Sequence, residues 1–188
     1  MLAAAASGNV EQVKSLLAKG ANPDRADAEG TTALMLAAEG SAPTDMVEAL
    51  LNAGAHVDSV DAQGRSALYR ASAQGKTGAI GLLIDHQANP NLRATDFSTA
   101  LIEAVSHGRL EAAQLLIDRG ADVNLGDANN TTPLMIAANA STAIANPGEL
   151  VRLLLQHGAK RGAKDSRGRI AFQIAVESKN EAAVQLLK

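Results

Sequence analysis

The stretch that decides the fold is Thr99 to Asn124, which reads Thr-Ala-Leu-Ile-Glu-Ala-Val-Ser-His-Gly-Arg-Leu-Glu-Ala-Ala-Gln-Leu-Leu-Ile-Asp-Arg-Gly-Ala-Asp-Val-Asn. Its apolar spacing predicts a helix, a turn, a second helix and a glycine stop. A unit of this size cannot bury its own apolar face, so it has to stack on neighbouring units of the same kind. The stretch therefore predicts a solenoid, whose function is to present a surface.

Copies of this unit fill the rest of the chain. A hydroxyl residue opens four of them, at Thr32, Ser66, Thr99 and Thr132, and Gly-Ala closes the second helix in most copies. Aligning the copies on these residues gives six repeats in a single array over residues 1–188, with the first and last incomplete. The repeats are 1–26, 27–60, 61–93, 94–126, 127–164 and 165–188. Helix pairs are expected near 32–39 and 45–52, 66–73 and 76–85, 99–106 and 109–118, and 132–139 and 148–156.

The composition agrees with closely packed helices. Aromatic residues make up only 2% of the 188 residues while alanine is abundant, which argues against a sheet sandwich built on large side chains. The net charge of −3 gives no general electrostatic case for binding nucleic acid. The absence of cysteine excludes disulfides and thiolate metal sites. No run of 18 apolar residues occurs, so we expect no membrane span.

Physical reasons can be given for the residues that punctuate each copy. Thr132 is expected to cap a helix whose first residue is Pro133. The glycines of the Gly-Ala pairs are expected to end the second helices in the left-handed conformation, and Gln87 stands in that position at a cost of about 1 kcal/mol. Turn-forming residues follow at Asp24, Asp58, Asn91 and Asn124.

Period, order and punctuation together resemble the ankyrin repeat. Asp127-Ala-Asn-Asn-Thr-Thr-Pro-Leu-Met-Ile-Ala-Ala is similar to the family's opening pattern Asp-x-x-Gly-x-Thr-Pro-Leu-His-x-Ala-Ala, and Gly120-Ala-Asp-Val-Asn matches its closing pattern. The resemblance covers the whole chain and implies an all-α ankyrin-repeat solenoid of stacked helix-turn-helix units with short hairpin loops. The histidine of the family's opening pattern is missing here, and Leu2, Met35, Tyr69, Ile102, Met135 and Gln173 take its place.

The sequence lacks the motifs that catalysis and metal binding require. His86 and His157 occupy the same position two repeats apart, which separates them by roughly 20 Å if helices pack 8–10 Å apart. Gly75-Lys76-Thr77 lacks the first glycine of a phosphate-binding loop. The sequence has neither a nucleophile elbow nor a His-Glu-x-x-His motif. We therefore expect no enzyme activity, no catalytic residues, no metal and no cofactor.

The resemblance implies a non-catalytic protein-binding module that recognises a protein partner through its concave face and hairpin fingertips. Two alternatives stay open: an inhibitor or immunity-type protein that caps an enzyme or toxin, and a structural spacer. Nucleic-acid binding through the basic residues of 160–169 ranks behind these, because no aromatic side chain is interleaved with them. The candidate partner-binding residues are Glu29, Arg65, Tyr69, Arg70, Gln74, Asp96, Phe97, Glu103, His107, Asn129, Arg167 and Arg169.

Three local features carry separate expectations. Phe97 replaces a hairpin glycine, so its ring is either displayed on a fingertip or folded back over the next hairpin. Arg70 and Glu103 take the same position in adjacent repeats, which favours an ion pair between them over two separate outward contacts. Repeat 5 has five extra residues within 140–148, so its second helix should restart near Pro147 after a bulge over 141–145.

The sequence leaves the compartment open. We expect a monomer that lies in the cytoplasm by default, or in the periplasm or outside the cell if a signal peptide was removed before Met1.

Overall fold

The computed structural model describes residues 1–40, 44–139 and 147–188, and these ranges contain twelve helices and no strand. The helices form six consecutive pairs. In the four pairs predicted from the sequence, each helix begins and ends within one residue of its predicted bounds. In the described ranges, β-type pairing consists of an isolated antiparallel bridge between Val60 and Ser66. The pairs are α1 (Leu2–Ala6) and α2 (Val10–Ala18), α3 (Ala33–Glu39) and α4 (Thr44–Asn52), α5 (Ala67–Gln74) and α6 (Thr77–Asp85), α7 (Ala100–Ser106) and α8 (Leu110–Asp118), α9 (Pro133–Ala138) and α10 (Pro147–Gln156), and α11 (Ala171–Glu177) and α12 (Glu181–Leu187).

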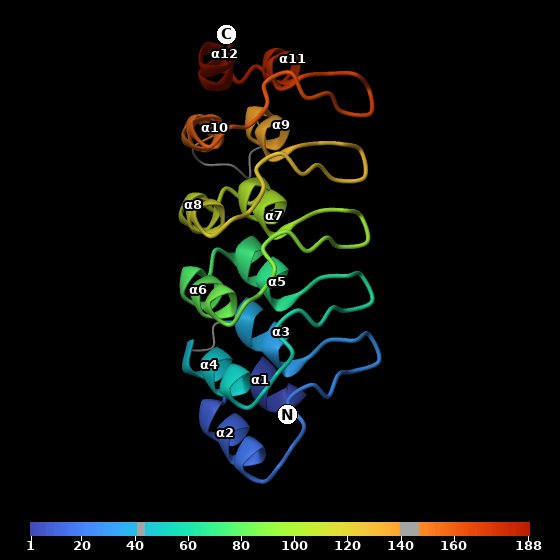
Figure 1. Ribbon diagram of the computed structural model, residues 1–188, viewed down its shortest axis with the longest axis vertical. Helices are drawn as coiled ribbons and strands as arrows, with labels where there is room; N and C mark the ends of the chain where they lie inside the picture. Colours follow the sequence, from blue (N-terminus) through green and yellow to red (C-terminus); the bar gives the residue numbers. More distant parts are fainter. Residues whose placement is uncertain (41–43, 140–146) are drawn as a thin grey trace.

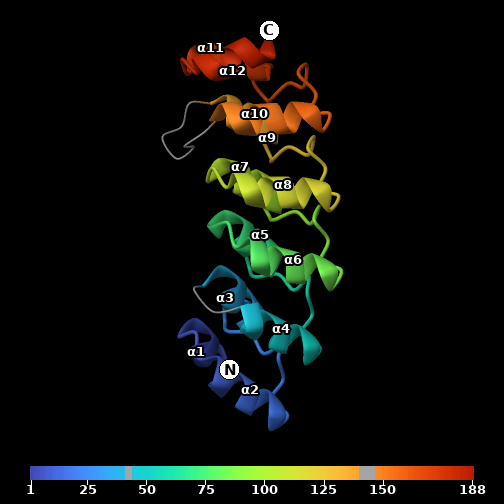
Figure 2. The ribbon, with the colours of Figure 1, turned by 90° about the vertical axis from the view of Figure 1, so that its left-hand side faces the viewer.

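The pairs stack in chain order, with the two termini at opposite ends of the array (Figure 1). The first helices of the pairs form an inner layer, and the second helices form an outer layer, seen face-on in Figure 2. Hairpin loops project from the inner layer, away from the outer helices (Figure 1). We call the surface formed by the inner helices and the hairpins the inner face. The all-α solenoid expected from the sequence is confirmed.

Hydroxyl side chains start the inner helices as the sequence predicts. Thr99 Oγ1 accepts a hydrogen bond from the Ile102 amide, 3.3 Å away, and the hydroxyls of Thr32, Ser66 and Thr132 accept the equivalent bond. This bond satisfies one of the amides that the first turn of a helix leaves without a partner. Ile170 has no hydroxyl, and there the Gln173 side chain instead accepts a hydrogen bond from the Ile170 amide at 2.9 Å.

Alanine allows the inner helices to pack closely. One alanine recurs at the same position in the inner helices and is at most 3% exposed in every copy, at Ala4, Ala37, Ala71, Ala104, Ala137 and Ala175. Larger side chains such as Leu101 and Leu116 fill the space between the layers and belong to the same continuous core. Each helix pair is thus covered by its neighbours, as expected for a repeat array in which stability comes from the interfaces.

Gln87 keeps the left-handed conformation that glycine has at the ends of α2, α4, α8 and α10. Its φ is 68°, against 86° for Gly54 in the same position of the preceding repeat. A non-glycine residue costs about 1 kcal/mol in this region, because its Cβ approaches the following carbonyl. We therefore expect Gln87→Gly to raise the free energy of unfolding by about 1 kcal/mol.

Urea unfolding of the Gln87→Gly variant and of the reverse exchange, Gly54→Gln, measures this cost. Open space surrounds a Cβ built at Gly54, so the reverse exchange should destabilise by a similar amount through backbone strain alone. Equal stability of both variants and the wild type would show that the conformation at this position carries no cost.

The second helix of repeat 5 begins at Pro147, as predicted from the proline and the glutamate that follows it. The predicted bulge over 141–145 lies outside the described residues. Within the described ranges, none of the helices combines the length and the apolar character needed to cross a lipid bilayer.

Candidate functional site

The hairpins of the described residues form a continuous row along the inner face, and they lie at 27–31, 61–65, 94–98, 127–131 and 165–169. Each one is joined to the next by a backbone hydrogen bond, for example from the Ala62 amide to the Glu29 carbonyl at 2.9 Å and from the Ala128 amide to the Asp96 carbonyl at 2.8 Å. The equivalent bonds run from Thr95 to Gln63 and from Ser166 to Asn129. The fingertips are therefore fixed relative to one another and present their side chains as one surface.

An aspartate at the first position shapes most hairpins. Asp61 Oδ1 accepts hydrogen bonds from the amides two and four residues further on, both at 2.9 Å, and Asp127 does the same at 2.8 Å. Asp27 and Asp165 make equivalent bonds. In the fourth repeat this position is Ala94, and Asp96 accepts from both the hydroxyl and the amide of Ser98 instead. These Ser98 bonds lower the pKa of Asp96.

A network of ion pairs crosses the inner face between repeats 2 and 3. Arg70 donates from Nη2 to Asp61 Oδ2 at 2.6 Å and from Nη1 to Glu39 Oε2 at 2.8 Å. Arg65 Nε donates to the same oxygen of Asp61 at 2.9 Å. The Asp61 side chain is fully buried and that of Arg70 is 13% exposed. Because the network joins a hairpin to two inner helices, it fixes the shape of this part of the inner face.

The ionised state of Asp61 is favoured within this network. Burial alone would raise the pKa of Asp61, but the hydrogen bonds from the Arg65 amide and from the two arginine side chains outweigh burial. The pKa of Asp61 consequently lies below its ordinary value of 3.8.

The predicted ion pair between Arg70 and Glu103 is wrong. Both positions are enclosed as expected, but Arg70 turns back toward its own hairpin and the preceding repeat, where Asp61 supplies a fully buried carboxylate. Glu103 instead lies near His107 of its own repeat, whose Nδ1 is 3.7 Å from Glu103 Oε2. Side chains on a helix lean toward its N-terminus, which brings Arg70 nearer to its hairpin than to the next inner helix.

Tyr69 connects the inner helix of repeat 3 to the hairpin of repeat 4. Its hydroxyl lies 3.2 Å from Ser98 Oγ, and Ser98 in turn lies 2.5 Å from Asp96 Oδ1. Burial, together with the nearby carboxylate of Glu103, raises the pKa of Tyr69 to about 12. The phenol therefore stays protonated and available to donate a hydrogen bond.

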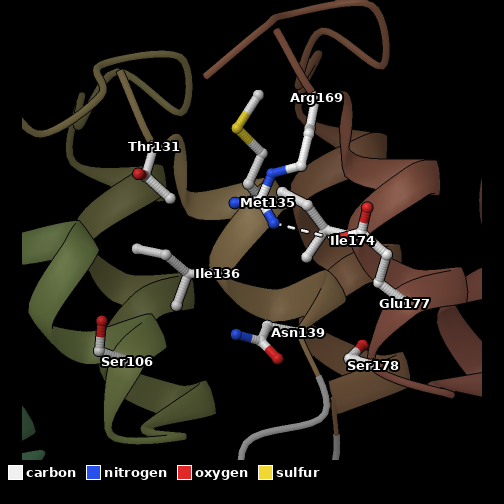
Figure 3. A pocket seen from close by; sticks show the side chains of 9 residues that line it. All are labelled: Ser106, Thr131, Met135, Ile136, Asn139, Arg169, Ile174, Glu177 and Ser178. Carbon is white, nitrogen blue, oxygen red and sulfur yellow. Dashed lines mark hydrogen bonds and ion pairs between the residues drawn. The ribbon is translucent and has the colours of Figure 1, made fainter. Parts of the chain in front are cut away.

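A pocket of about 520 Å³ opens on the inner face between α7, α9 and α11 (Figure 3). Apolar side chains of Met135, Ile136 and Ile174 line its walls, and an ion pair of 2.9 Å between Arg169 Nη1 and Glu177 Oε2 borders it. Arg169 is held in place by Asp165, with Nε and Nη2 2.9 and 2.8 Å from Asp165 Oδ2. The polar lining residues are Ser106, Thr131, Asn139 and Ser178.

The candidate residues fall into groups rather than one cluster. Arg65 and Arg70 share the Asp61 network, and Tyr69, Asp96 and Glu103 lie together one repeat further on. Arg169 belongs to the pocket, one repeat beyond the exposed fingertip of Asn129. His107 is exposed and lies beside Glu103. The others, which are also exposed, are Glu29, Gln74, Phe97 and Arg167.

Of the two predicted positions of the Phe97 ring, the structure has the exposed one on the fingertip. The residue is 51% exposed, and the guanidinium carbon of Arg93 lies 4.7 Å from the ring centroid. Arg93 Nε also donates to the Phe97 carbonyl at 3.1 Å. The cation covers one face of the ring and leaves an aromatic surface on the fingertip.

Sequence reasoning missed Asp61, the centre of the ion network. An aspartate followed four residues later by arginine occurs at Asp61 and Arg65 and again at Asp165 and Arg169, and this spacing was a usable signal. Sequence reasoning also treated the closing turns only as local turns and missed their contacts with the next repeat. Their side chains accept bonds from the next repeat, as Asp24 does from the His56 amide at 2.8 Å.

No group of three or more potential metal ligands gathers anywhere in the residues that the structure describes.

Comparisons with known proteins agree with this architecture. A family model described as "Ankyrin repeats (3 copies)" matches residues 1–94 and 101–188. Among solved structures, 560 chains match, and one of them is the crystal structure of EF0377, an ankyrin repeat protein. It is 26% identical with a TM-score of 0.90, over 99% of this chain and 94% of that one. No curated protein sequence gives a significant match.

Proposed function

Because the chain belongs to the ankyrin repeat family, whose members generally mediate protein–protein interactions, we propose that it is a non-catalytic module that binds a protein partner through its inner face. The pocket between α7, α9 and α11 is the observation that carries the proposal. A space of about 520 Å³ with apolar walls is large enough to take side chains of a partner, and apolar anchors in such pockets supply much of the energy of an interface.

The polar surroundings of the pocket also suit a protein ligand. Arg169 pairs with Glu177 and is also held by Asp165, so the position of its guanidinium is set before a partner arrives. Asn139 and Thr131 offer hydrogen-bond donors and acceptors to a partner backbone. A surface that is already ordered loses little conformational entropy on binding, which favours affinity.

Ile136→Arg tests the proposal with little risk to the fold. Ile136 stands at the inner-helix position that holds Arg70 in repeat 3 and Glu103 in repeat 4, so the array accepts a charged side chain there. The new arginine would lie near Asp127, the counterpart of Asp61, and would fill the pocket. We expect the amount of partner recovered from a lysate of the source cells to fall at least about tenfold.

Quantitative mass spectrometry of proteins captured on immobilised wild type and variant gives the readout. Glu48→Arg serves as the control, because Glu48 is exposed on the outer helix α4 and the substitution introduces the same side chain. Partner recovery that is unchanged by Ile136→Arg, with melting temperatures equal, would contradict binding through this pocket.

A further inference from the structure

A second hollow lies on the opposite side of the array, in the outer layer between α8 and α10. Figure 2 shows α10 above α8 in the stack. It has a volume of about 710 Å³, and its apolar surface comes from Leu110, Leu115 and Leu153. We call it the outer groove. Nothing in the proposed function uses it, because the inner face is formed by other helices and by the hairpins.

Two of the three leucines of the outer groove, Leu110 and Leu115, are only partly buried, whereas Leu153 is 5% exposed and belongs to the core. On α8 the residues buried in the core include Ala112, Ala113 and Leu116, which are at most 1% exposed. Leu110 and Leu115 of the same helix remain partly exposed. Repeat 1 has Val10 at the position of Leu110, repeats 2 and 3 have Thr44 and Thr77, and repeat 5 has Gly148. The fold thus accepts polar and small residues there as well as apolar ones, so the partly exposed side chain of Leu110 is available for contact with another molecule.

The rim of the outer groove is acidic. Glu111 and Glu149 are exposed in the first turns of α8 and α10, and Asp118 lies at the end of α8, where its Oδ1 accepts from Gln114 Nε2 at 2.8 Å. Arg152 is the one cation among the described residues that line the groove, which leaves a net charge of −2. Within the described residues none of Glu111, Glu149 and Arg152 forms an ion pair.

We propose that the outer groove binds a segment of a second protein in which leucine-like side chains are flanked by lysine or arginine. The apolar side chains would enter between Leu110, Leu115 and Leu153, and the cations would face Glu111 and Glu149. Complementary charge of this kind speeds association and selects the partner, while the apolar contact supplies most of the affinity. One array would then hold two proteins on opposite faces.

A fluorescein-labelled helical peptide with two leucines four residues apart, flanked by lysines, is the probe. Fluorescence anisotropy measures its dissociation constant with the full chain. The double variant Glu111→Lys/Glu149→Lys should weaken binding at least about tenfold, and Leu110→Thr at least about threefold. Leu110→Thr introduces the residue that repeats 2 and 3 have at this position, so the fold should tolerate it.

Two controls separate the groove from general attraction between charges. Glu11→Lys changes an exposed glutamate at the same position of α2 and should leave binding unchanged. A peptide of equal charge with serine in place of leucine should bind at least about tenfold more weakly than the leucine peptide.

Three results would overturn the proposal. They are no binding of the leucine peptide by the wild type, equal binding by wild type and double variant, and sedimentation that shows a dimer which the double variant abolishes. The last result would assign the groove to a second copy of the chain. Each is independent of Ile136→Arg on the inner face, so the two binding surfaces succeed or fail separately.

Discussion

Asp61→Asn is expected to lower the free energy of unfolding by about 3 kcal/mol, which corresponds to a fall in melting temperature of about 6–12 °C. The asparagine can still accept the amide bonds of Gln63 and Arg65, so hairpin geometry is kept. The substitution removes only the negative charge that faces Arg70 and Arg65. Because Arg70 is 13% exposed, loss of this partner leaves its charge poorly compensated inside the protein.

Asp127→Asn is the matched control for this experiment. Asp127 accepts the same two amide bonds at 2.8 Å, and no cation of the described chain pairs with it. Its substitution should therefore cost less than about 1 kcal/mol. If urea unfolding gives equal losses for the two variants, the ion network adds nothing to stability.

The pH dependence of the same pair provides a second readout. Since the pKa of folded Asp61 lies below its ordinary 3.8, the contribution of its charge is complete above pH 3.8 and is lost as the pH falls through the folded pKa. The difference in unfolding free energy between wild type and Asp61→Asn should thus be largest near neutral pH and shrink as the pH falls below 3.8. A difference that does not change with pH would contradict the ionic origin of the effect.

Ala104→Leu is expected to lower the free energy of unfolding by about 2–3 kcal/mol. Ala104 has no exposed surface and lies on α7, which packs between α5 and α9. A leucine there adds three carbon atoms where the neighbouring helices leave no room, and the helices have to move apart. Such a shift disturbs the interfaces on both sides of α7 in the middle of the array.

Ala3→Leu controls for the choice of leucine. Ala3 lies on the inner helix α1 but is exposed, so this change should alter stability by less than about 0.5 kcal/mol. Thermal melts followed by circular dichroism compare the two variants. An Ala104→Leu protein as stable as Ala3→Leu would show that the inner helices are not closely packed at this alanine.

The sequence predicted the fold well because the features that define it are local and repeated. Thr99 as a helix cap and Gly120 as a helix end act within a few residues of their own position, so spacing along the chain is enough to identify them. The candidate site was harder to predict, because its contacts join different repeats. Arg70 has acidic residues on both sides along the solenoid, and the choice between Asp61 and Glu103 depends on the direction of its side chain.

The inner-face pocket and the outer groove were hard to predict for a similar reason. The repeat alignment marks neither Ile136 nor Leu110, because Ile136 has apolar counterparts at Leu36 and Ile174 and Leu110 has one at Val10. Whether such a residue lines a pocket depends on the spacing between neighbouring helices, which the alignment does not contain. Phe97 was easier, because a hairpin tip projects from the array and a large side chain there has few ways to be covered.

Hydrogen exchange of the protein with and without the partner whose capture depends on Ile136 is the most direct test of binding through the inner face. Slowed amide exchange is predicted in peptides that cover 131–139 and 169–178, with the outer helix segments 110–118 and 149–156 unchanged. Slowed exchange confined to the outer helix segments, or absent from 131–139 and 169–178, would contradict the proposed function.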